Sequence, residues 1–383
     1  MLCRSLINSL NYRLFTVILF CLGWLSDAVA DNSKYVILIT IDGMHAGMVT
    51  DPEMPSPYLK MMKREGLFVD KVKGVPPTAT YPSHTSIVTG ALPVHHRIFY
   101  NAPFVFNKDS VVSYWYADSI KVPTIWQAAK ESGFTTASLF WPVSTKSRWI
   151  DYNIPEYWSV KRVANQLDFI KPVCTPSGIL DELEENAVGR LDHLTFGAGS
   201  ITRDARTAHM ANYIMNKYHP NLMTIHLITT DYAQHATGMQ SERTRMAVAS
   251  ADHAIGLIVE NLKQTHRMDS TTIIVCGDHG FSDINRVIAP NVWLTHAGLL
   301  SEKPGGDWKA CFHGNGSVMF LYLRDSNDKK TLEKVENIIQ NLPVETRSLF
   351  KVVSQKELTA MGGDPKVALA LEPIAGISVS TNR

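Results

Sequence analysis

The sequence is poor in cysteine, has little net charge, and lacks a long basic run or, after its first thirty residues, a long apolar one. Its 383 residues include 5 Cys, and 37 Lys and Arg nearly balance 36 Asp and Glu. Because binding to a phosphate backbone needs clustered Lys and Arg, this balance argues against a nucleic-acid scaffold. The 45% hydrophobic and 19% charged residues are typical of a globular protein, which argues against a disordered or coiled-coil chain.

Residues 1–30 are interpreted as a secretory signal peptide. Arg4 and Arg13 precede an apolar stretch over residues 14–25, and Ala28-Val29-Ala30 supplies the small side chains that a signal peptidase accepts. The apolar stretch is shorter than the roughly 20 residues that span a bilayer, although an uncleaved anchor stays an open alternative. We therefore expect a secreted or periplasmic protein with no membrane span beyond the signal peptide.

Removal of the signal peptide leaves three cysteines, which cannot all pair with one another. Cys276 ends an apolar run over residues 271–276 and is expected to be a buried strand thiol. Cys174 and Cys311 then remain as a possible disulfide in an oxidising compartment, with two free thiols as the alternative.

Short β-branched runs alternate with helical patterns, which indicates an α/β fold with a parallel sheet. The runs at residues 35–40, 135–140, 222–228 and 271–276 are apolar on both faces and are expected in the middle of a sheet covered on both sides. Amphipathic helices with a proline start or a glycine stop are predicted near residues 57–65, 123–132 and 246–262. A further strand and helix are predicted at residues 317–323 and 332–342.

Residues 31–383 are predicted to form one domain. Residues 141–203 show little periodicity and many aromatic side chains, so they are interpreted as an insertion. We expect this insertion to lie over the carboxyl ends of the strands, where ligands bind in open α/β sheets.

Polar side chains suited to a metal ion follow three of the predicted strands. Asp42 follows the first, Asp231 and His235 follow another, and Asp278 and His279 follow a third. The spacing of four residues between Asp231 and His235 places both side chains on one face of a helical turn. Each group alone is typical of a turn or a solvated loop, but their joint placement after three strands predicts a metal site.

A fourth element, residues 77–85, places Thr80 at the start of a predicted helix. Backbone N–H groups and the positive end of the helix dipole face an incoming anion there. A nearby Zn²⁺ would help to deprotonate the hydroxyl, which alone is a poor nucleophile. The alternative is that Thr80 only caps the helix.

In their order and separation, these motifs resemble those of the alkaline phosphatase superfamily, most closely its nucleotide pyrophosphatase/phosphodiesterase branch and, within that, its secreted bacterial members. The resemblance to the branch is carried by Ile41-Asp42-Gly43, residues 77–84, Thr89-Gly90 followed by Pro93, His96 and Asn101, the Asp231/His235 pair and Asp278-His279-Gly280. The stretches at residues 141–143 and 155–158 look like those of the secreted bacterial members. It implies an alkaline-phosphatase-like, mostly parallel central sheet with helices on both faces and an insertion over the active site. It also implies zinc-dependent hydrolysis of phosphodiester or phosphoanhydride bonds through a covalent phosphothreonine, with a small-molecule phosphodiester or nucleotide as substrate.

The resemblance further implies two Zn²⁺ ions per chain and a role for each motif residue. The first ion would be held by Asp42, Thr80, Asp278 and His279, and the second by Asp231 and His235. Thr80 would be the nucleophile, Asn101 would donate a hydrogen bond to the phosphoryl oxygen, and Tyr81 would contact the substrate.

The sequence departs from the family pattern at two places. The family has a further ligand histidine well beyond the Asp-His pair, and only His296 and His313 follow His279 here. Either His313 replaces that ligand, or the C-terminal end of the domain is missing and the second ion has two protein ligands. Ala79 stands where nucleotide-cleaving relatives often carry lysine, which leaves a phospholipid or choline-type headgroup open as the substrate.

Two alternative functions remain open at this level. A phosphomonoesterase of the same superfamily would need further cationic groups around the terminal phosphate. A catalytically impaired, metal-poor binding protein would follow from the absent ligand histidine. His84 and Asp252 are interpreted as structural polar residues.

Overall fold

The computed structural model describes residues 34–383 apart from 107–111, 159–166, 304 and 315, so the predicted signal peptide lies outside it. Its first lobe is built on a five-stranded sheet in the order β3-β2-β4-β1-β5, with every pair parallel. The strands are β1 (Tyr35–Ile41), β2 (Thr136–Leu139), β3 (Tyr152–Ile154), β4 (Leu222–Leu227) and β5 (Thr271–Gly277). The predicted α/β class is confirmed, and the sheet is all-parallel.

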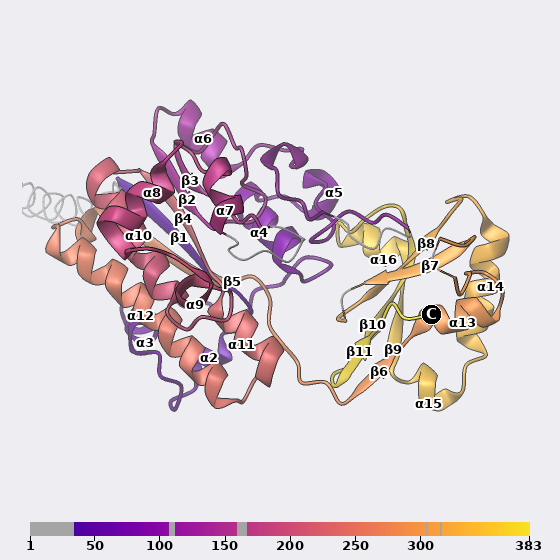
Figure 1. The fold of residues 1–383 in the computed structure, drawn as a ribbon. Helices are drawn as coiled ribbons and strands as arrows, with labels where there is room; N and C mark the ends of the chain where they lie inside the picture. The colour runs from indigo at the N-terminus through magenta and orange to yellow at the C-terminus, as the bar shows by residue number, and fades with distance from the viewer. Residues whose placement is uncertain (1–33, 107–111, 159–166, 304, 315) are drawn as a thin grey trace, which may run out of the picture.

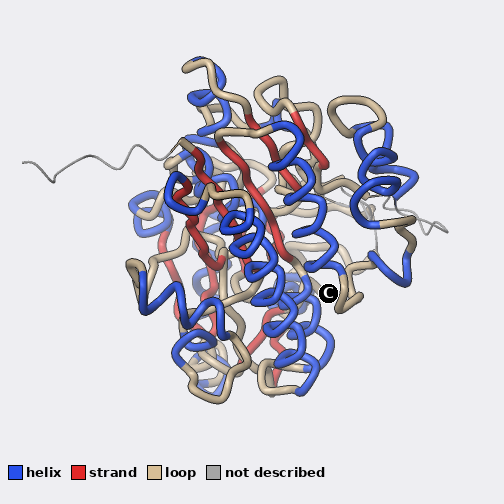
Figure 2. Tube along the Cα trace, turned by 90° about the vertical axis from the view of Figure 1, so that its left-hand side faces the viewer, coloured by secondary structure: helices blue, strands red, loops and turns tan. Residues whose placement is uncertain are grey.

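Helices cover both faces of this sheet, because alternate strand residues face opposite sides. Ile37 and Ile39 point into a core shared with α3 (Pro57–Glu65), α10 (Arg203–Tyr218) and α12 (Glu242–Gln264). Leu38 points the other way, toward α4 (Thr80–Thr89) and α6 (Ile125–Glu131). Figure 2 shows helices running along the strands in the layered arrangement that these two cores produce.

The prediction that all four apolar runs lie inside the sheet is wrong for β5, which is an edge strand. Its residues alternate between more and less exposed positions, Ile274 is 46% exposed, and Cys276 is only half-buried. An apolar run indicates that a strand packs against other elements, but it does not show whether a second strand pairs along its free side.

The second lobe, drawn at the yellow end of the colour range in Figure 1, contains a four-stranded sheet that the sequence did not predict. Its strands are β7 (Ala310–Gly314), β8 (Met319–Leu323), β9 (Phe350–Ser354) and β10 (Val367–Pro373), in the antiparallel order β7-β8-β10-β9. The predicted strand at 317–323 corresponds to β8, and the predicted helix at 332–342 to α14 (Lys329–Gln340). A short parallel pair, β6 (Arg286–Ile288) and β11 (Ile377–Val379), lies beside this sheet.

Residues 141–203 are more than an irregular insertion. They supply β3 and bury Ile154, Leu180 and Leu183 in the core of the first lobe. Short helices follow β3: α7 (Leu167–Ile170), η2 (Lys171–Val173), α8 (Ile179–Leu183), η3 (Glu184–Val188) and α9 (His193–Phe196).

The remaining helices are short connections, apart from α11 (Thr229–Thr237), which belongs to the site described below. They are α2 (Gly47–Thr50), α5 (Pro93–His96), η1 (Ala117–Ser119), η4 (Met268–Ser270), α13 (Pro290–His296), α15 (Val344–Arg347) and α16 (Gln355–Ala360). Within the described ranges, no helix has both the length and the apolar character needed to cross a bilayer.

The possible disulfide between Cys174 and Cys311 does not form. Both are buried free thiols, and they belong to different cores. Cys174 packs in the core of the first lobe, whereas Cys311 packs in that of the second. The number of cysteines made this pair possible, but Cys174 and Cys311 lie in different lobes and cannot meet.

Candidate active site

The carboxyl ends of three neighbouring strands bring the predicted acidic residues and histidines to one place. Asp42 follows β1, Asp231 lies in α11 directly after β4, and Asp278 and His279 follow β5. Asp42, Asp231 and His279 each offer a ligand atom within 4.8 Å of the others. The parallel sheet thus joins side chains that are almost 240 residues apart in the sequence.

Two buried carboxylates each have one oxygen held by the protein and one oxygen without a hydrogen bond. Asp278 Oδ1 accepts from the backbone N–H groups of Gly43 (3.0 Å) and His279 (2.9 Å), while Asp42 Oδ2 lies 3.1 Å from His226 Nε2. Within the described residues, the other oxygens, Asp42 Oδ1 and Asp278 Oδ2, are buried and accept no hydrogen bond, and the nearest donors are histidine nitrogens at 3.3–3.5 Å. Such orphaned acceptors fit a bound cation, because leaving a buried charged oxygen unpaired is costly.

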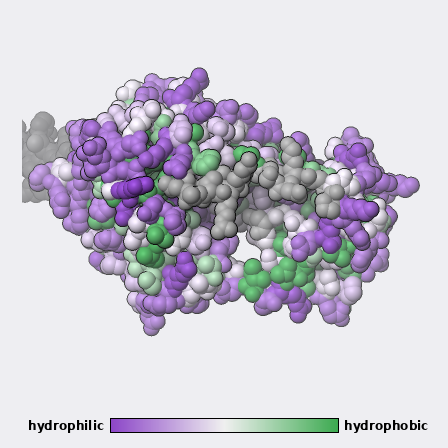
Figure 3. Space-filling model, viewed as in Figure 1, coloured by the Kyte–Doolittle hydropathy of each residue, from purple (hydrophilic) through white to green (hydrophobic). Residues whose placement is uncertain are grey.

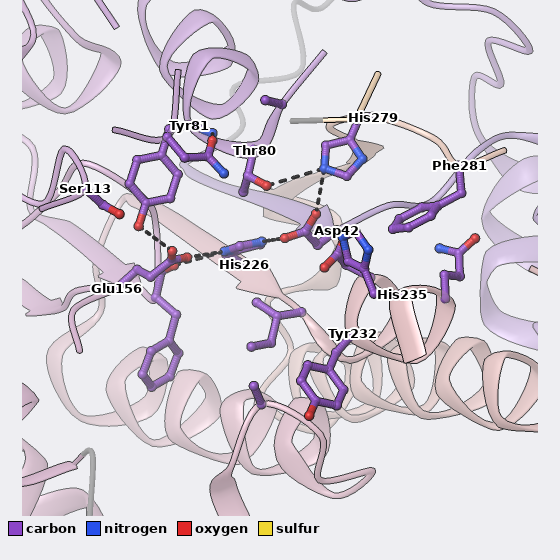
Figure 4. A pocket seen from close by; sticks show the side chains of 18 of the residues that line it. Asp42, Thr80, Tyr81, Ser113, Glu156, His226, Tyr232, His235, His279 and Phe281 are labelled. Carbon is purple, nitrogen blue, oxygen red and sulfur yellow. Dashed lines mark hydrogen bonds and ion pairs between the residues drawn. The ribbon is translucent and has the colours of Figure 1, made fainter. Parts of the chain in front are cut away.

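His279 and Thr80 complete this set of donors. His279 Nε2 lies 3.3 Å from Asp42 Oδ1, 3.5 Å from Asp278 Oδ2 and 3.4 Å from Thr80 Oγ1. Figure 4 shows His279 between Thr80 and Asp42, with its ring directed at both side chains. Carboxylate oxygens and an imidazole nitrogen are ligands that proteins use for divalent metal ions.

Thr80 is the first residue of α4 and does not cap it. Ala79 occupies the capping position, and no side chain there accepts a hydrogen bond from the helix. The buried ring of His84 is hydrogen bonded to the carbonyl oxygen of Thr80 (2.8 Å) and to Thr40 Oγ1 (2.8 Å), so it ties the start of α4 to β1. His84 has the structural role expected of it, and the Thr80 hydroxyl stays free to face His279.

The amide of Asn101 is oriented by the backbone next to Thr80. Its Oδ1 accepts a hydrogen bond from Tyr81 N at 3.0 Å. Because this contact uses the carbonyl end, the NH₂ end is left to donate, and Asn101 lines the same cleft as Thr80. This geometry suits the donor role that the family resemblance implies.

Glu156 and His226, to which the sequence assigned no role in the site, connect Tyr81 to Asp42. Tyr81 Oη donates to Glu156 Oε1 at 2.7 Å, and Glu156 Oε2 lies 3.1 Å from His226 Nδ1. The other ring nitrogen of His226 reaches Asp42 Oδ2. Figure 4 shows this row of side chains across the floor of the site. A histidine inside the otherwise apolar strand at 222–227 was the only signal that could have revealed it.

The charges of this cluster shift its pKa values strongly. Burial opposes the charged form of His226, but its bonds to Asp42 and Glu156 prevail and raise its pKa well above the usual value. Burial would likewise raise the pKa of Asp42, but the contacts of its carboxylate with His226 and His279 lower it instead. Burial, together with the nearby Asp42 charge, raises the pKa of Asp278 well above its usual value. The two histidines therefore stabilise the charged form of Asp42, whereas burial opposes the charged form of Asp278.

Asp231 and His235 form a second, more exposed pair. Asp231 Oδ1 lies 3.5 Å from His235 Nε2, and the two residues are neighbours on α11, as the spacing predicted. Burial and the charge of Asp42 raise the pKa of Asp231 to about 7. The pair could contribute to a second metal position next to the first.

The loop that carries Asp278 and His279 needs glycine before it. A Cβ at Gly277 would lie 1.9 Å from the carbonyl oxygen of Met44, and backbone cannot move aside as a flexible side chain can. Gly277 therefore allows the end of β5 to approach the turn after β1.

His313 lies away from these residues. It belongs to β7 in the second lobe, where its ring packs 5.2 Å from that of Tyr100 and 5.1 Å from that of Phe104. It is not among the described residues that line the cleft. The hypothesis that His313 replaces the family's last ligand is therefore not supported by the structure.

The site opens into a cleft of about 1190 Å³ between the lobes. One wall comes from the segment after β3 and from α9, and the second lobe contributes Gly316, Ser317, Ile377 and Ser378. Figure 3 shows the gap between the lobes, with hydrophobic residues gathered over β6 and β11 beside it. The cleft is large enough for a nucleotide-sized ligand.

The fold and site together define an α/β protein with a candidate metal site, built from carboxylates and histidines, at the carboxyl edge of its parallel sheet. The sequence model described as Type I phosphodiesterase / nucleotide pyrophosphatase matches residues 36–362. The chain belongs to this family.

Two relatives with similar sequences are distant and longer. A venom phosphodiesterase of Macrovipera lebetinus is 24% identical over an alignment of 286 positions that covers 69% of this chain and 28% of the snake protein. Ectonucleotide pyrophosphatase/phosphodiesterase family member 3 of Mus musculus is 25% identical over an alignment of 276 positions that covers 67% of this chain and 27% of the mouse protein. The chain thus spans less than a third of the length of these relatives.

Solved structures show the same fold. Murine ectonucleotide pyrophosphatase/phosphodiesterase 5 superposes with a TM-score of 0.64 at 18% identity, covering 91% of this chain and 81% of the murine one. An inactive variant of the murine protein in complex with AMP gives a TM-score of 0.63 at 17% identity, with the same coverage.

Proposed function

We propose that this chain is a zinc-dependent phosphodiesterase that cleaves phosphodiester or phosphoanhydride bonds through a covalent bond to Thr80. The observation that carries the proposal is the convergence of Thr80 Oγ1 and His279 Nε2 with two orphaned carboxylate oxygens, those of Asp42 and Asp278. Membership of the family supports the reaction class. The murine structure with AMP supports a nucleotide as one candidate substrate.

Asp42, Asp278, His279 and Thr80 would hold the first ion, and Asp231 and His235 would contribute to the second. Zinc, when bound, acts as a Lewis acid that lowers the pKa of the Thr80 hydroxyl and stabilises negative charge on the phosphoryl oxygens. The cleft lining supports the need for cations, because five carboxylates line it and would otherwise repel a phosphate ester.

The residues of the chain then perform a two-step displacement. Thr80 Oγ1 forms a bond to phosphorus, the bond from phosphorus to the leaving-group oxygen breaks, and the leaving group takes up a proton. Asn101 donates to the phosphoryl oxygen as negative charge develops there. Water then attacks phosphorus and releases the Thr80 hydroxyl.

A monoesterase would need several cations around a terminal phosphate. Among the described residues that line the cleft, Arg203 is the single lysine or arginine. The diester assignment therefore ranks above the monoester one. A rate with p-nitrophenyl phosphate far above that with bis-p-nitrophenyl phosphate would reverse this order.

The direct test is hydrolysis of bis-p-nitrophenyl phosphate and p-nitrophenyl-TMP by the full chain with excess Zn²⁺, at pH 8 so that Asp231 has lost its proton. We expect Thr80→Ala to lower kcat/KM about a thousandfold or more, because it removes the nucleophile. Thr89→Ala is the matched control, since Thr89 lies on the same helix and its hydroxyl donates to Thr85 O outside the cleft. A zinc-loaded wild type without turnover, or an active Thr80→Ala variant, would refute the mechanism.

Secretion is a separate proposal that follows from residues 1–30. Expression of the full chain in a bacterium, followed by fractionation and N-terminal sequencing, tests it. A mature N-terminus close to residue 31 supports export, and an uncleaved cytoplasmic product contradicts it.

A further inference from the structure

The described lining of the cleft contains one arginine that the proposed reaction does not use. Arg203 is the only lysine or arginine among the described lining residues, which also include five carboxylates: Asp42, Glu156, Asp192, Asp231 and Asp283. A cation in such surroundings is expected to pair with one of them. Within the described residues, however, the Arg203 guanidinium forms no ion pair, and its one hydrogen bond goes from Nη1 to the carbonyl oxygen of Phe196 (3.0 Å).

Aromatic rings hold this guanidinium in place. Its central carbon lies 4.6 Å from the centre of the Phe196 ring and 5.2 Å from that of Phe140. Cation–π contacts of this kind restrict the side chain without using its N–H groups. A guanidinium has five N–H donors, so most of them stay available to a ligand in the cleft.

The position of Arg203 lies close to the reaction centre but is separate from it. Phe140, on which the guanidinium rests, has its carbonyl oxygen 3.1 Å from His226 Nδ1. The opposite nitrogen of His226 lies 3.1 Å from Asp42 Oδ2. The side chain of His226 therefore lies between Phe140, against which Arg203 packs, and Asp42, the first candidate metal ligand.

Arg203 remains charged in these surroundings. Burial lowers its pKa to about 10, although the negative charges of Asp204 and Glu156 act to raise it. A half-buried charge without a partner is costly, and a bound anion would remove this cost. Asp204 forms no ion pair with Arg203 within the described residues: its Oδ1 accepts from Ile228 N at 3.2 Å, and its buried Oδ2 accepts no hydrogen bond there.

We propose that Arg203 forms a subsite for a second anionic group of the substrate, distinct from the position of the phosphate that reacts. The substrate class would be a phosphodiester or phosphoanhydride that carries another phosphate, which the planar guanidinium can bind with two parallel hydrogen bonds. This inference rests on the proposed function and specifies its substrate.

The test compares ligands that differ by one phosphate, using the zinc-loaded full chain with Thr80→Ala so that nothing is hydrolysed. Isothermal titration would measure the Kd values of AMP, ADP and adenosine 3′,5′-bisphosphate. The same titrations would be made with Arg203→Gln, Arg203→Lys and Arg206→Gln added. Arg206 is the matched control, because it lies on the same helix, donates to Val188 O and does not line the cleft.

We expect at least one doubly phosphorylated ligand to bind more tightly than AMP. Arg203→Gln should weaken that ligand about tenfold or more, with little effect on AMP, since a charge-assisted contact to phosphate is lost. Arg203→Lys should restore part of the affinity, and Arg206→Gln should change nothing. A role confined to balancing the charge of Asp204 would not depend on the second phosphate.

Equal affinity for all three ligands, including failure of all three to bind, would overturn the subsite. So would an equal loss for every ligand in Arg203→Gln. Hydrolysis of bis-p-nitrophenyl phosphate, which has no second anion, separates this result from failure of the proposed function. A chain that cleaves this diester but shows no dependence on the second phosphate keeps the activity and loses the subsite.

Discussion

At the scale of single residues, His226 is the position whose importance only the structure reveals. Both of its ring nitrogens face carboxylates, Asp42 on one side and Glu156 on the other. Its contact with Asp42 Oδ2 leaves Oδ1 directed at His279. Residues that orient a metal ligand in this way affect metal affinity without touching the ion.

We predict that His226→Leu weakens zinc binding about 10- to 100-fold, because Asp42 loses the donor that orients it. His226→Gln should weaken it less, since the amide can still donate to Asp42. The measurement is the zinc Kd by chelator competition, with circular dichroism to show that each variant is folded. Equal Kd values for folded His226→Leu and wild type would contradict this role.

At the scale of elements, the first lobe depends on contacts between helices that are far apart in the sequence. The N-terminus of α3 has no side-chain cap from its own Ser56. Asp252 in α12 supplies the acceptor instead and receives the N–H groups of Tyr58 (3.2 Å) and Leu59 (2.8 Å). This is the structural role that the sequence analysis gave Asp252, with partners that it could not name.

Asp252→Ala should lower the free energy of unfolding by about 1–2 kcal/mol, as loss of a helix cap does. Asp252→Asn keeps an acceptor oxygen and should cost less. Urea denaturation monitored by circular dichroism gives both values. If the alanine and asparagine variants were equally stable, the capping contacts would not carry the effect.

The order of strands is another property of elements that local sequence leaves open. The alternation of β-branched runs and helical patterns was sufficient to predict a parallel sheet with helices on both faces. It could not place β5 at the edge, because strand neighbours are decided by contacts between distant segments. For the same reason, β3 was hidden in residues 141–203, since a three-residue strand is too short to show a period.

At the scale of the whole molecule, the two lobes have separate cores and meet at the cleft. Two cysteines can be used to test this division, because Cys174 lies in the core of the first lobe and Cys311 in that of the second. Burial raises the pKa of Cys174 to about 12 and that of Cys311 to about 11, so both thiols should react slowly in the native state.

We predict that Cys174, Cys276 and Cys311 are all alkylated when the protein is denatured without a reductant. Mass spectrometry of the digested protein identifies the modified peptides. Under native conditions, Cys174 and Cys311 should be protected from the same reagent. Recovery of a peptide pair linked through Cys174 and Cys311 would contradict the separate cores.

The sequence by itself determined the class of fold and most of the candidate metal ligands, because both are encoded locally. Hydrophobic period distinguishes strands from helices, and a polar group directly after a buried strand must lie at the carboxyl edge of a parallel sheet. Tertiary structure alone decided the edge position of β5, the second lobe, the aromatic surroundings of His313, and the contacts of His226 and Arg203. These features depend on which distant segments pack together, and neither the hydrophobic period nor the spacing of motifs contains that information.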